Sequence, residues 1–200
     1  KKQTPPKVLE GHDGAVISVK MSPNSLFVAS CSYDGTIKIW DVKSGTEITT
    51  LRGHQGSVNA IGFNLKGDRL ASVGDDGTIR IWDPLAATEK ATLIGHSQAV
   101  NCATFSATNQ IATASSDKTV KLWDVGLSAT EDSGSYGSSF SSAPKESDKP
   151  KTSEGIRGHN AVINQVSLSP NGDLLLTASD DKTIGLWSIE RNKKNSNNPK

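Results

Sequence analysis

The stretch GHQGSVNAIGFNLKGDRLASVGDDGTIRIWD, residues 53–83, recurs in outline three more times along the chain. In each copy a Gly-His pair is followed by a Trp, which lies 28 residues after the His in three copies and 27 in the copy that ends at Trp123. The 200-residue chain has four His and four Trp, and all eight obey this spacing. Two rare residue types in the same phase four times indicate a structural repeat. The other copies begin at Gly11, Gly95 and Gly158.

Each repeat has the composition of several short strands joined by turns. An apolar run follows Gly-His, and a turn such as Ser-Pro-Asn leads into a second run rich in small residues. An Asp-Gly or Asp-Lys turn precedes a third run that ends in Trp, and a fourth run such as EITTLRG (47–53) leads to the next Gly-His. Alternating β-branched residues between turn signals favour antiparallel strands, and no stretch has a helical period. The sequence therefore predicts an all-β fold.

The spacing from Gly-His to Trp-Asp resembles that of the WD-repeat family of β-propellers. The resemblance covers residues 7–190 apart from one insert, and Ser188 replaces the final Asp of the last repeat. It implies a β-propeller of four-stranded antiparallel blades, either partial or closed with four blades. The expected blades lie at about 11–52, 53–94, 95–157 and 158–190.

The resemblance also implies a hydrogen-bond network inside each blade. Its members would be the Gly-His histidine, a Ser or Thr of the second strand, the Asp of the following turn and the Trp. Gly74 takes the place of the Ser in the second repeat, so we expect that network to lack one member. The expected members are His12, Ser32, Asp34 and Trp40; His54, Asp76 and Trp82; His96, Ser115, Asp117 and Trp123; and His159, Ser179, Asp181 and Trp187.

His12, Ser32 and Asp34 have the residue types of a serine-hydrolase triad. One catalytic site per domain suffices, yet this trio recurs in three repeats and each time leads to a Trp, which favours a structural role. The sequence has no nucleophile elbow, phosphate-binding loop or metal-ligand cluster. We expect no catalytic residue, no metal site and no cofactor.

By the same resemblance, a partner would bind on the face near the central channel. The exposed positions expected there are polar and mildly acidic, which suits a protein or peptide ligand that carries Lys or Arg, with Tyr33 as an aromatic anchor. The alternative is that they are ordinary solvated loop residues. The positions are Ile17, Asn59, Asn101 and Asn164 on the first strands, and Tyr33, Asp75, Ser116 and Asp180 before the turn Asp.

Composition narrows the classes of partner. The net charge is +1, from 22 basic and 21 acidic residues, which gives no electrostatic basis for direct nucleic-acid or membrane binding. No apolar run approaches the roughly 18 residues of a membrane helix. Cys31 and Cys102 lie in apolar β-like runs, which favours buried thiols and a reducing compartment, the cytoplasm or the nucleus.

We therefore expect a non-catalytic protein–protein interaction scaffold that serves assembly of a multiprotein complex. A substrate-receptor subunit of a ubiquitin ligase is less favoured, because members of that class often have Arg two positions after Trp-Asp and none is present here. A structural module of a ribonucleoprotein complex and an enzyme are further alternatives.

The two ends of the chain do not decide whether the propeller closes into a ring. PKVLE, residues 6–10, has the character of an outer strand and could complete the fourth blade. Because known WD propellers usually have about seven blades, although propellers as a class have from about four to eight, we favour an excerpt of a larger propeller over a four-bladed ring or pairing with a second chain.

A Ser-rich insert separates the third and fourth repeats. Residues 126–154 include nine Ser and few apolar residues, so we expect a disordered loop within the third blade. The insert is either a tolerated loop expansion or a phosphorylatable docking segment around Ser139, Ser141 and Ser142, near Lys145 and Lys149. The tail, 191–200, is also expected to be disordered.

Overall fold

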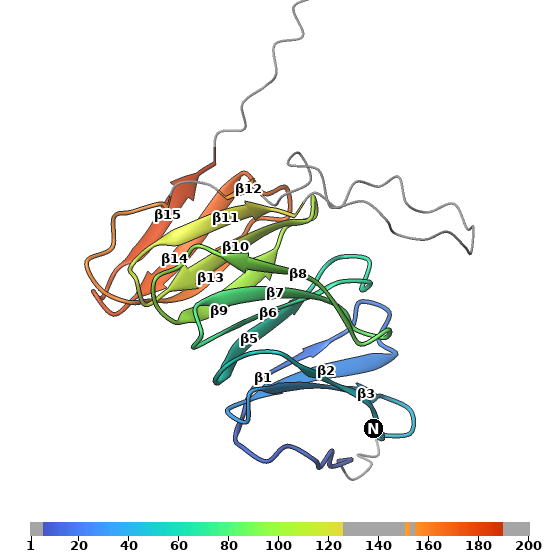
Figure 1. Cartoon of the computed structure of the whole chain (residues 1–200). Coiled ribbons are helices and arrows are strands. Elements are labelled where there is room, and N and C mark those ends of the chain that lie inside the picture. Colours follow the sequence, from blue (N-terminus) through green and yellow to red (C-terminus); the bar gives the residue numbers. More distant parts are fainter. Residues whose placement is uncertain (1–5, 126–150, 153–154, 190–200) are drawn as a thin grey trace, which may run out of the picture.

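The fold is a stack of four antiparallel sheets, here called blades one to four (Figure 1). The structure is a computed structural model that describes residues 6–125, 151–152 and 155–189, and it has strands but no helix within those ranges. The first two blades are β1 (Val16–Met21), β2 (Phe27–Ser32), β3 (Thr36–Asp41), β4 (Glu47–Arg52) and β5 (Val58–Phe63), β6 (Leu70–Gly74), β7 (Thr78–Asp83), β8 (Thr88–Ile94). The others are β9 (Val100–Phe105), β10 (Gln110–Ser115), β11 (Val120–Asp124), β12 (Lys151–Thr152) and β13 (Ile163–Leu168), β14 (Leu174–Ser179), β15 (Ile184–Ser188).

The first strand of every blade carries a β-bulge near its start. The register of β1 against β2 shifts between Val16 and Ser18, which leaves Ile17 without a residue opposite. The same shift falls at Asn59, Asn101 and Asn164 in β5, β9 and β13. A bulge re-aims the side chain of the extra residue. These four bulge residues are the ones predicted from the sequence to face a partner.

The hydrophobic core lies between the blades, in three clusters. The first cluster joins β2, β3 and β4 of blade one to β5, Leu70 and Trp82 of blade two. The second and third clusters repeat this arrangement between blades two and three and between blades three and four. Each blade therefore buries its apolar residues against its neighbours along the chain, as expected of a repeat array.

The stack forms an open arc, with blades one and four at opposite ends (Figure 1). Residues 6–10 form no strand, and Lys7 Nζ instead donates to the Lys43 carbonyl of blade one. Blade four has three strands in the described part of the chain. The expectation that residues 6–10 complete blade four is therefore wrong for this arrangement, because they lie at the far end of the arc.

Most of the insert and the whole tail lie outside the described residues. These include Ser139, Ser141 and Ser142 and the segment 191–200, so the expectations for them remain predictions. Within the range 126–154, however, Lys151 and Thr152 form β12, which pairs with Asp124 and Trp123. The boundary given to the insert is thus too wide, because it includes the outer strand of blade three.

Candidate functional site

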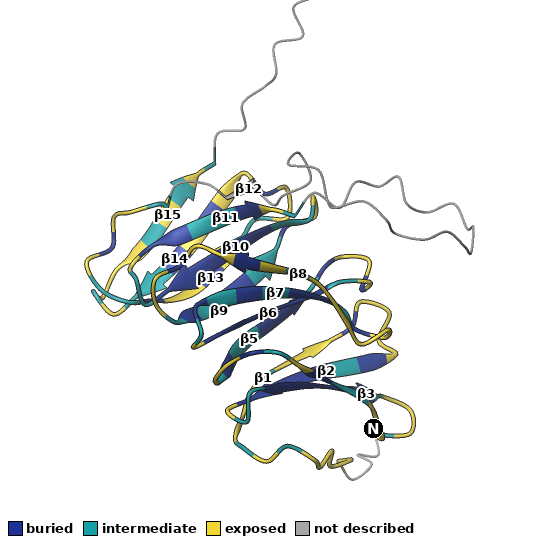
Figure 2. Cartoon of the chain, in the orientation of Figure 1, coloured by how far each residue is buried: buried dark blue, intermediate teal, exposed yellow. Residues whose placement is uncertain are grey.

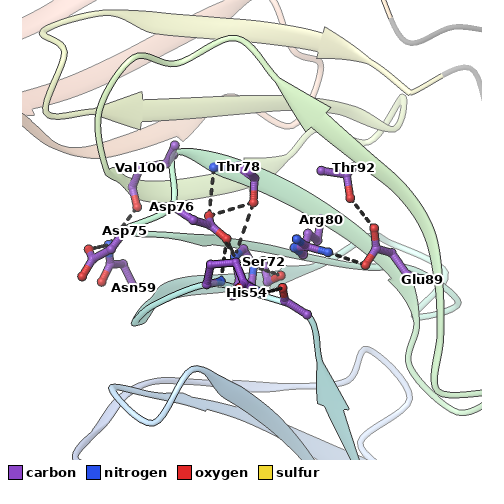
Figure 3. Close-up of polar contacts among 12 residues, drawn as sticks. His54, Asn59, Ser72, Asp75, Asp76, Thr78, Arg80, Glu89, Thr92 and Val100 are labelled. Atoms are coloured by element: carbon purple, nitrogen blue, oxygen red, sulfur yellow. Dashed lines mark hydrogen bonds and ion pairs between the residues drawn. The ribbon is translucent and has the colours of Figure 1, made fainter.

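A chain of hydrogen bonds crosses the middle of each blade, and Figure 3 shows part of it in blade two. His54 Nδ1 lies 3.0 Å from Asp76 Oδ2, and His54 Nε2 lies 2.7 Å from Ser72 Oγ. Trp82 Nε1 donates to the same hydroxyl over 2.8 Å. Four side chains from four separate segments are thereby joined.

The same chain recurs in the other blades with nearly the same distances. The His–Asp and His–hydroxyl contacts are each 2.7–2.8 Å, and the indole N–H donates to the hydroxyl over 2.8–3.0 Å. The members are His12, Asp34, Ser30 and Trp40; His96, Asp117, Thr113 and Trp123; and His159, Asp181, Thr177 and Trp187.

The hydroxyl is two residues earlier than the sequence-based assignment. Ser32 does not bridge the His and the Trp; its Oγ accepts the backbone N–H of Asp34 in the turn. Ser115 and Ser179 have that turn role in blades three and four. The expectation that Gly74 leaves blade two short of one member is also wrong, because Ser72 supplies the hydroxyl.

Each turn Asp is held as a carboxylate by more than its His. Burial would raise the pKa of Asp76, but the N–H of Gln55 and the hydroxyl and N–H of Thr78 lower it to about 2. Burial would likewise raise the pKa of Asp117. Hydrogen bonds from the Thr119 hydroxyl and from His96 outweigh that effect and lower the pKa to about 2. Asp34 and Asp181 make the same contacts, and their pKa values are also lowered.

The direction of the hydrogen bonds follows from these charges. A carboxylate only accepts, so His54 Nδ1 carries the proton and Nε2 accepts from the hydroxyl, which in turn accepts from Trp82. Burial lowers the pKa of His54 and of His96, which keeps both rings neutral near pH 7. Every polar hydrogen in the chain is thus used once, and no member is left unsatisfied.

The order Asp–His–hydroxyl matches that of a hydrolase triad, but the hydroxyl has no access to a substrate. Ser72 is fully buried, and its oxygen accepts the indole N–H of Trp82 where a nucleophile would need a free lone pair. The corresponding hydroxyls of the other blades are buried as well. Among the described residues, no three His, Cys, Asp or Glu gather closely enough to hold a metal ion.

The glycine of each Gly-His pair makes room for the Trp of its blade. A Cβ on Gly95 would lie 3.0 Å from Trp123 Cη2, and one on Gly53 would lie 3.1 Å from Trp82 Cη2. A carbon at that distance is closer than ordinary van der Waals contact. The Gly-His and Trp elements of the repeat therefore depend on each other sterically as well as through hydrogen bonds.

The residues predicted to face a partner gather in pairs at the end of each blade where the turn Asp lies. Asn59 Nδ2 donates to Asp75 Oδ1 over 2.9 Å and to the Val100 carbonyl of blade three over 3.1 Å (Figure 3). The bulge and the turn thus bring the two predicted positions of blade two together. Asn59 also ties this blade to the next one.

Blades three and four repeat the pairing. Asn101 Nδ2 donates to Ser116 Oγ over 3.2 Å and to the Ile163 carbonyl of blade four over 2.9 Å. Asn164 Nδ2 donates to Asp180 Oδ1 over 2.6 Å. Three Asn-centred pairs therefore line consecutive blades, and Asp75 and Asp180 remain exposed.

Blade one differs, because Ile17 has no amide to bridge with. Ile17 and Tyr33 are both exposed, and Tyr33 N donates to the Ala15 carbonyl. Tyr33 therefore has the place in blade one that Asp75, Ser116 and Asp180 have in the other blades, before the turn Asp.

Two sets of residues were missed by the sequence reasoning. Lys118 and Lys182 follow the turn Asp with positive φ values of 66° and 70° and are exposed beside the paired residues. The Thr two positions after each turn Asp, such as Thr78, donates its hydroxyl to that carboxylate. The repeated Asp-Gly-Thr and Asp-Lys-Thr triplets were a signal that could have identified both sets.

A family profile described as "WD domain, G-beta repeat" matches residues 3–41, 45–83, 87–124 and 150–188, which is well over half of the chain. The chain belongs to the WD-repeat family. The resemblance inferred from the Gly-His and Trp spacing is thereby confirmed. The last three matched repeats each span the outer strand of one sheet and the first three strands of the next.

WD-repeat proteins of several kinds are similar to this chain. WD repeat-containing protein 18 of Bos taurus is 31% identical over 112 residues, covering 40% of this chain and 26% of the relative. Ribosome biogenesis protein ytm1 of Neosartorya fischeri is 32% identical over 89 residues, covering 44% and 15%. The Drosophila melanogaster protein HIRA homolog is 50% identical over 36 residues, covering 18% and 3%. The chain thus spans only a minor part of these relatives.

Solved structures share the fold. The crystal structure of the RRP9 WD40 repeats superimposes with a TM-score of 0.75 at 24% identity, covering 92% of this chain and 51% of the other. The structure of U3-55K gives the same values. The predicted all-β fold of WD-repeat blades is confirmed. No described segment forms a helix with the length and hydropathy that crossing a bilayer requires.

Proposed function

We propose that this chain is a non-catalytic protein-interaction scaffold that binds peptide segments carrying Lys or Arg on the face of the arc lined by Tyr33 and the Asn-centred pairs. The observation that carries the proposal is the use of every His-Asp-hydroxyl group as internal support. All four are committed to hydrogen bonds within the blades, and the exposed polar groups lie beyond them, on the bulges and turns. Rigid support beneath exposed side chains favours binding over chemistry.

The distribution of charge favours blades one and two as the site for the basic part of the ligand. Asp75 is exposed there, and the turns of these blades have Gly after the half-buried Asp. In blades three and four the exposed Lys118 and Lys182 offset the negative charge of Asp180. A Lys or Arg side chain could pair with Asp75 while a neighbouring one stacks on the Tyr33 ring.

A peptide-library selection with the full chain tests this proposal. The wild-type chain should enrich peptides with Lys or Arg. Tyr33→Ala and Asp75→Asn should each weaken binding of a selected peptide about tenfold or more, with a smaller effect for Asp180→Asn. Asp68→Asn is the matched control, because Asp68 is an exposed carboxylate in the β5–β6 turn, at the other end of the same strands. Enrichment without basic residues, or equal binding by all variants, would refute the proposed surface.

A second candidate is a module of a ribosome-biogenesis complex, an assembly role in the nucleus. Two of the similar proteins, ytm1 and the BOP1 homolog of Culex quinquefasciatus, are named for ribosome biogenesis. The near-zero net charge favours contacts to proteins of such a complex over direct RNA contacts. Co-sedimentation of the tagged chain with pre-ribosomal particles tests this candidate, and its absence from them would exclude it.

A further inference from the structure

The amide of Asn59 is fixed in one orientation, with its oxygen turned outward. Both N–H groups of Nδ2 are used, one by Asp75 Oδ1 over 2.9 Å and the other by the Val100 carbonyl over 3.1 Å. A carboxylate and a carbonyl only accept hydrogen bonds, so the amide oxygen cannot take the place of the nitrogen. Asn59 Oδ1 has no partner among the described residues and is not one of their buried unpaired atoms, so it is open to solvent.

Asn59 and Asp75 together present only hydrogen-bond acceptors. Asp75 is exposed, and its Oδ2 has no partner among the described residues. In Figure 3 the two side chains lie side by side at the edge of blade two. A ligand group that bonds both side chains must therefore offer at least two N–H donors, and no donor of the pair competes with it.

In blade one the equivalent pair of residues is apolar. Ile17 is the bulge residue of β1, as Asn59 is of β5, and the backbone N–H of Tyr33 makes the same bond across the bulge as that of Asp75. The side chains of Tyr33 and Ile17 are exposed, with 62% and 37% of each residue accessible. An aromatic ring and an aliphatic side chain therefore occupy the positions that an acid and an amide occupy in blade two.

Blade one gives up a hydrogen bond to present this apolar pair. In blades three and four, the carbonyl of the first residue of the inner strand accepts an Asn amide of the preceding blade. The equivalent carbonyl in blade two belongs to Val58, which is fully buried, and the equivalent of the Asn is Ile17, whose side chain has no N–H. In the described part of the chain no side chain donates to that carbonyl. A departure from a repeated pattern at the expense of stability is typical of a binding site.

Two glycines lie between the turn of blade one and Asp75. A Cβ on Gly35, in that turn, would be 3.0 Å from the Gly56 carbonyl oxygen, and a Cβ on Gly56 would be 3.4 Å from Asp75 Cβ. At the next junction Gln98 replaces the second glycine, and at the third Lys118 replaces the first. Figure 2 shows that exposed residues gather in such loops, whereas the strands of the middle blades are largely buried. Of the three junctions, that of blades one and two thus leaves the most room for a ligand side chain.

We propose that a single arginine of the ligand binds across blades one and two, and that this site prefers arginine to lysine. The proposal rests on the proposed function and names the residue that is recognised there. The guanidinium donates to Asp75 and to Asn59 Oδ1, its plane stacks on the Tyr33 ring, and its methylene groups lie against Ile17 above Gly56. A guanidinium has five N–H donors in one plane and stacks on aromatic rings, whereas an ammonium is a compact and more strongly hydrated charge.

Peptides that differ only in the basic residue test this preference. Peptides enriched by the library selection are resynthesised with that residue as arginine, lysine or citrulline, and their affinities for the full chain are measured by calorimetry. The arginine form should bind about tenfold or more tightly than the lysine form, and citrulline, which keeps the shape without the charge, should lose at least as much. Equal binding of the arginine and lysine forms would overturn the arginine site and leave the broader function in place. A selection that enriches no basic residue would remove both.

Two pairs of variants assign the preference to the proposed contacts. Tyr33→Leu should lose the preference for arginine and Tyr33→Phe should keep it, because only Phe retains a ring. Asn59→Ala should weaken binding of the arginine peptide about tenfold, whereas Asn101→Ala, which removes the same kind of bond to the next blade, should leave it unchanged. Equal effects of the two Asn variants would mean that blade-to-blade support matters rather than an acceptor for the ligand, and would overturn the proposal. A Tyr33→Leu chain that still prefers arginine would overturn it as well.

Discussion

Trp82 and His54 are joined through one shared atom, the Ser72 hydroxyl oxygen, which lies 2.8 Å from the indole nitrogen and 2.7 Å from the imidazole Nε2. The three residues come from β7, the Gly-His loop and β6. The hydroxyl is fully buried, so its removal would leave both nitrogens without their hydrogen-bond partner. One oxygen thus fixes the spacing of three segments.

We predict that Ser72→Ala lowers the free energy of unfolding by about 1–3 kcal/mol, because it leaves a buried indole N–H and a buried imidazole nitrogen without partners. Urea denaturation followed by Trp fluorescence measures the change. Ser72→Thr is the matched variant, since Thr113 and Thr177 have the same role in blades three and four. It should lose clearly less stability than Ser72→Ala, because it keeps the hydroxyl. Equal losses for Ala and Thr would mean that the hydroxyl is not the stabilising group.

We predict that the chain loses stability in two steps as the pH falls. The pKa values of His54 and His96 are lowered in the folded state, so below about pH 6.5 the unfolded chain binds more protons and folding weakens. The pKa of Asp76 and of Asp117 is about 2, against about 3.9 in an unfolded chain, so a second loss begins below about pH 5 and continues towards pH 2.

Urea midpoints between about pH 7.5 and pH 3 measure both steps. Asp76→Asn should start from a lower midpoint and show a shallower decline below pH 5, because its side chain no longer titrates. A midpoint that stays constant between pH 7.5 and 5 would contradict the burial of neutral histidines.

The sequence was sufficient to predict the blades but not to identify the hydroxyl that joins the His to the Trp. The phase of Gly-His and Trp located every sheet, because two rare residues mark each repeat. Ser30 and Ser32, however, lie two positions apart on one strand and so share a face of the sheet, which residue type alone cannot separate. The register of β2 against β3 determines which of the two serines meets the Trp. Val28 of β2 lies opposite Trp40 of β3, and the indole N–H of Trp40 donates to Ser30. Comparing the repeats would have helped, since of these two positions only that of Ser30 has a hydroxyl in all four repeats.

The arrangement of residues 6–10 could not be predicted from their composition. Their apolar pattern is that of an outer strand, and the repeat phase places them where such a strand belongs. Whether they pair depends on a sheet edge within reach, and the edge β15 lies at the other end of the arc (Figure 1). The strand character of residues 6–10 follows from their own sequence, whereas the sheet edge available to pair with them depends on the number of blades in the arc.

We predict that Gly95→Ala destabilises the chain by about 1–3 kcal/mol, because the new methyl group would press on Trp123. Trp123 is 2% exposed and hydrogen-bonded to Thr113, so it cannot move aside without breaking that bond. Gly62→Ala is the control: its Cβ would lie 3.5 Å from the Ala103 carbonyl oxygen, an ordinary contact. It should be neutral or stabilising by up to about 1 kcal/mol. Thermal unfolding of both variants measures the difference, and similar losses would show that any added methyl group is harmful.

We predict that the two thiols report separately on the two ends of the arc. Burial raises the pKa of Cys31 to about 12, and burial also raises the pKa of Cys102, so neither should react quickly with iodoacetamide in the folded chain at pH 8.

Cys31 lies in the core between blades one and two, whereas Cys102 packs between blades three and four, where its Sγ donates to the Val166 carbonyl. Blade four has fewer paired strands than blade one in the described residues, so its interface should open first. Pulsed alkylation over a urea series, read by peptide mass spectrometry, should therefore label Cys102 at a lower urea concentration than Cys31. Coincident midpoints for the two residues would instead mean that the four blades unfold together.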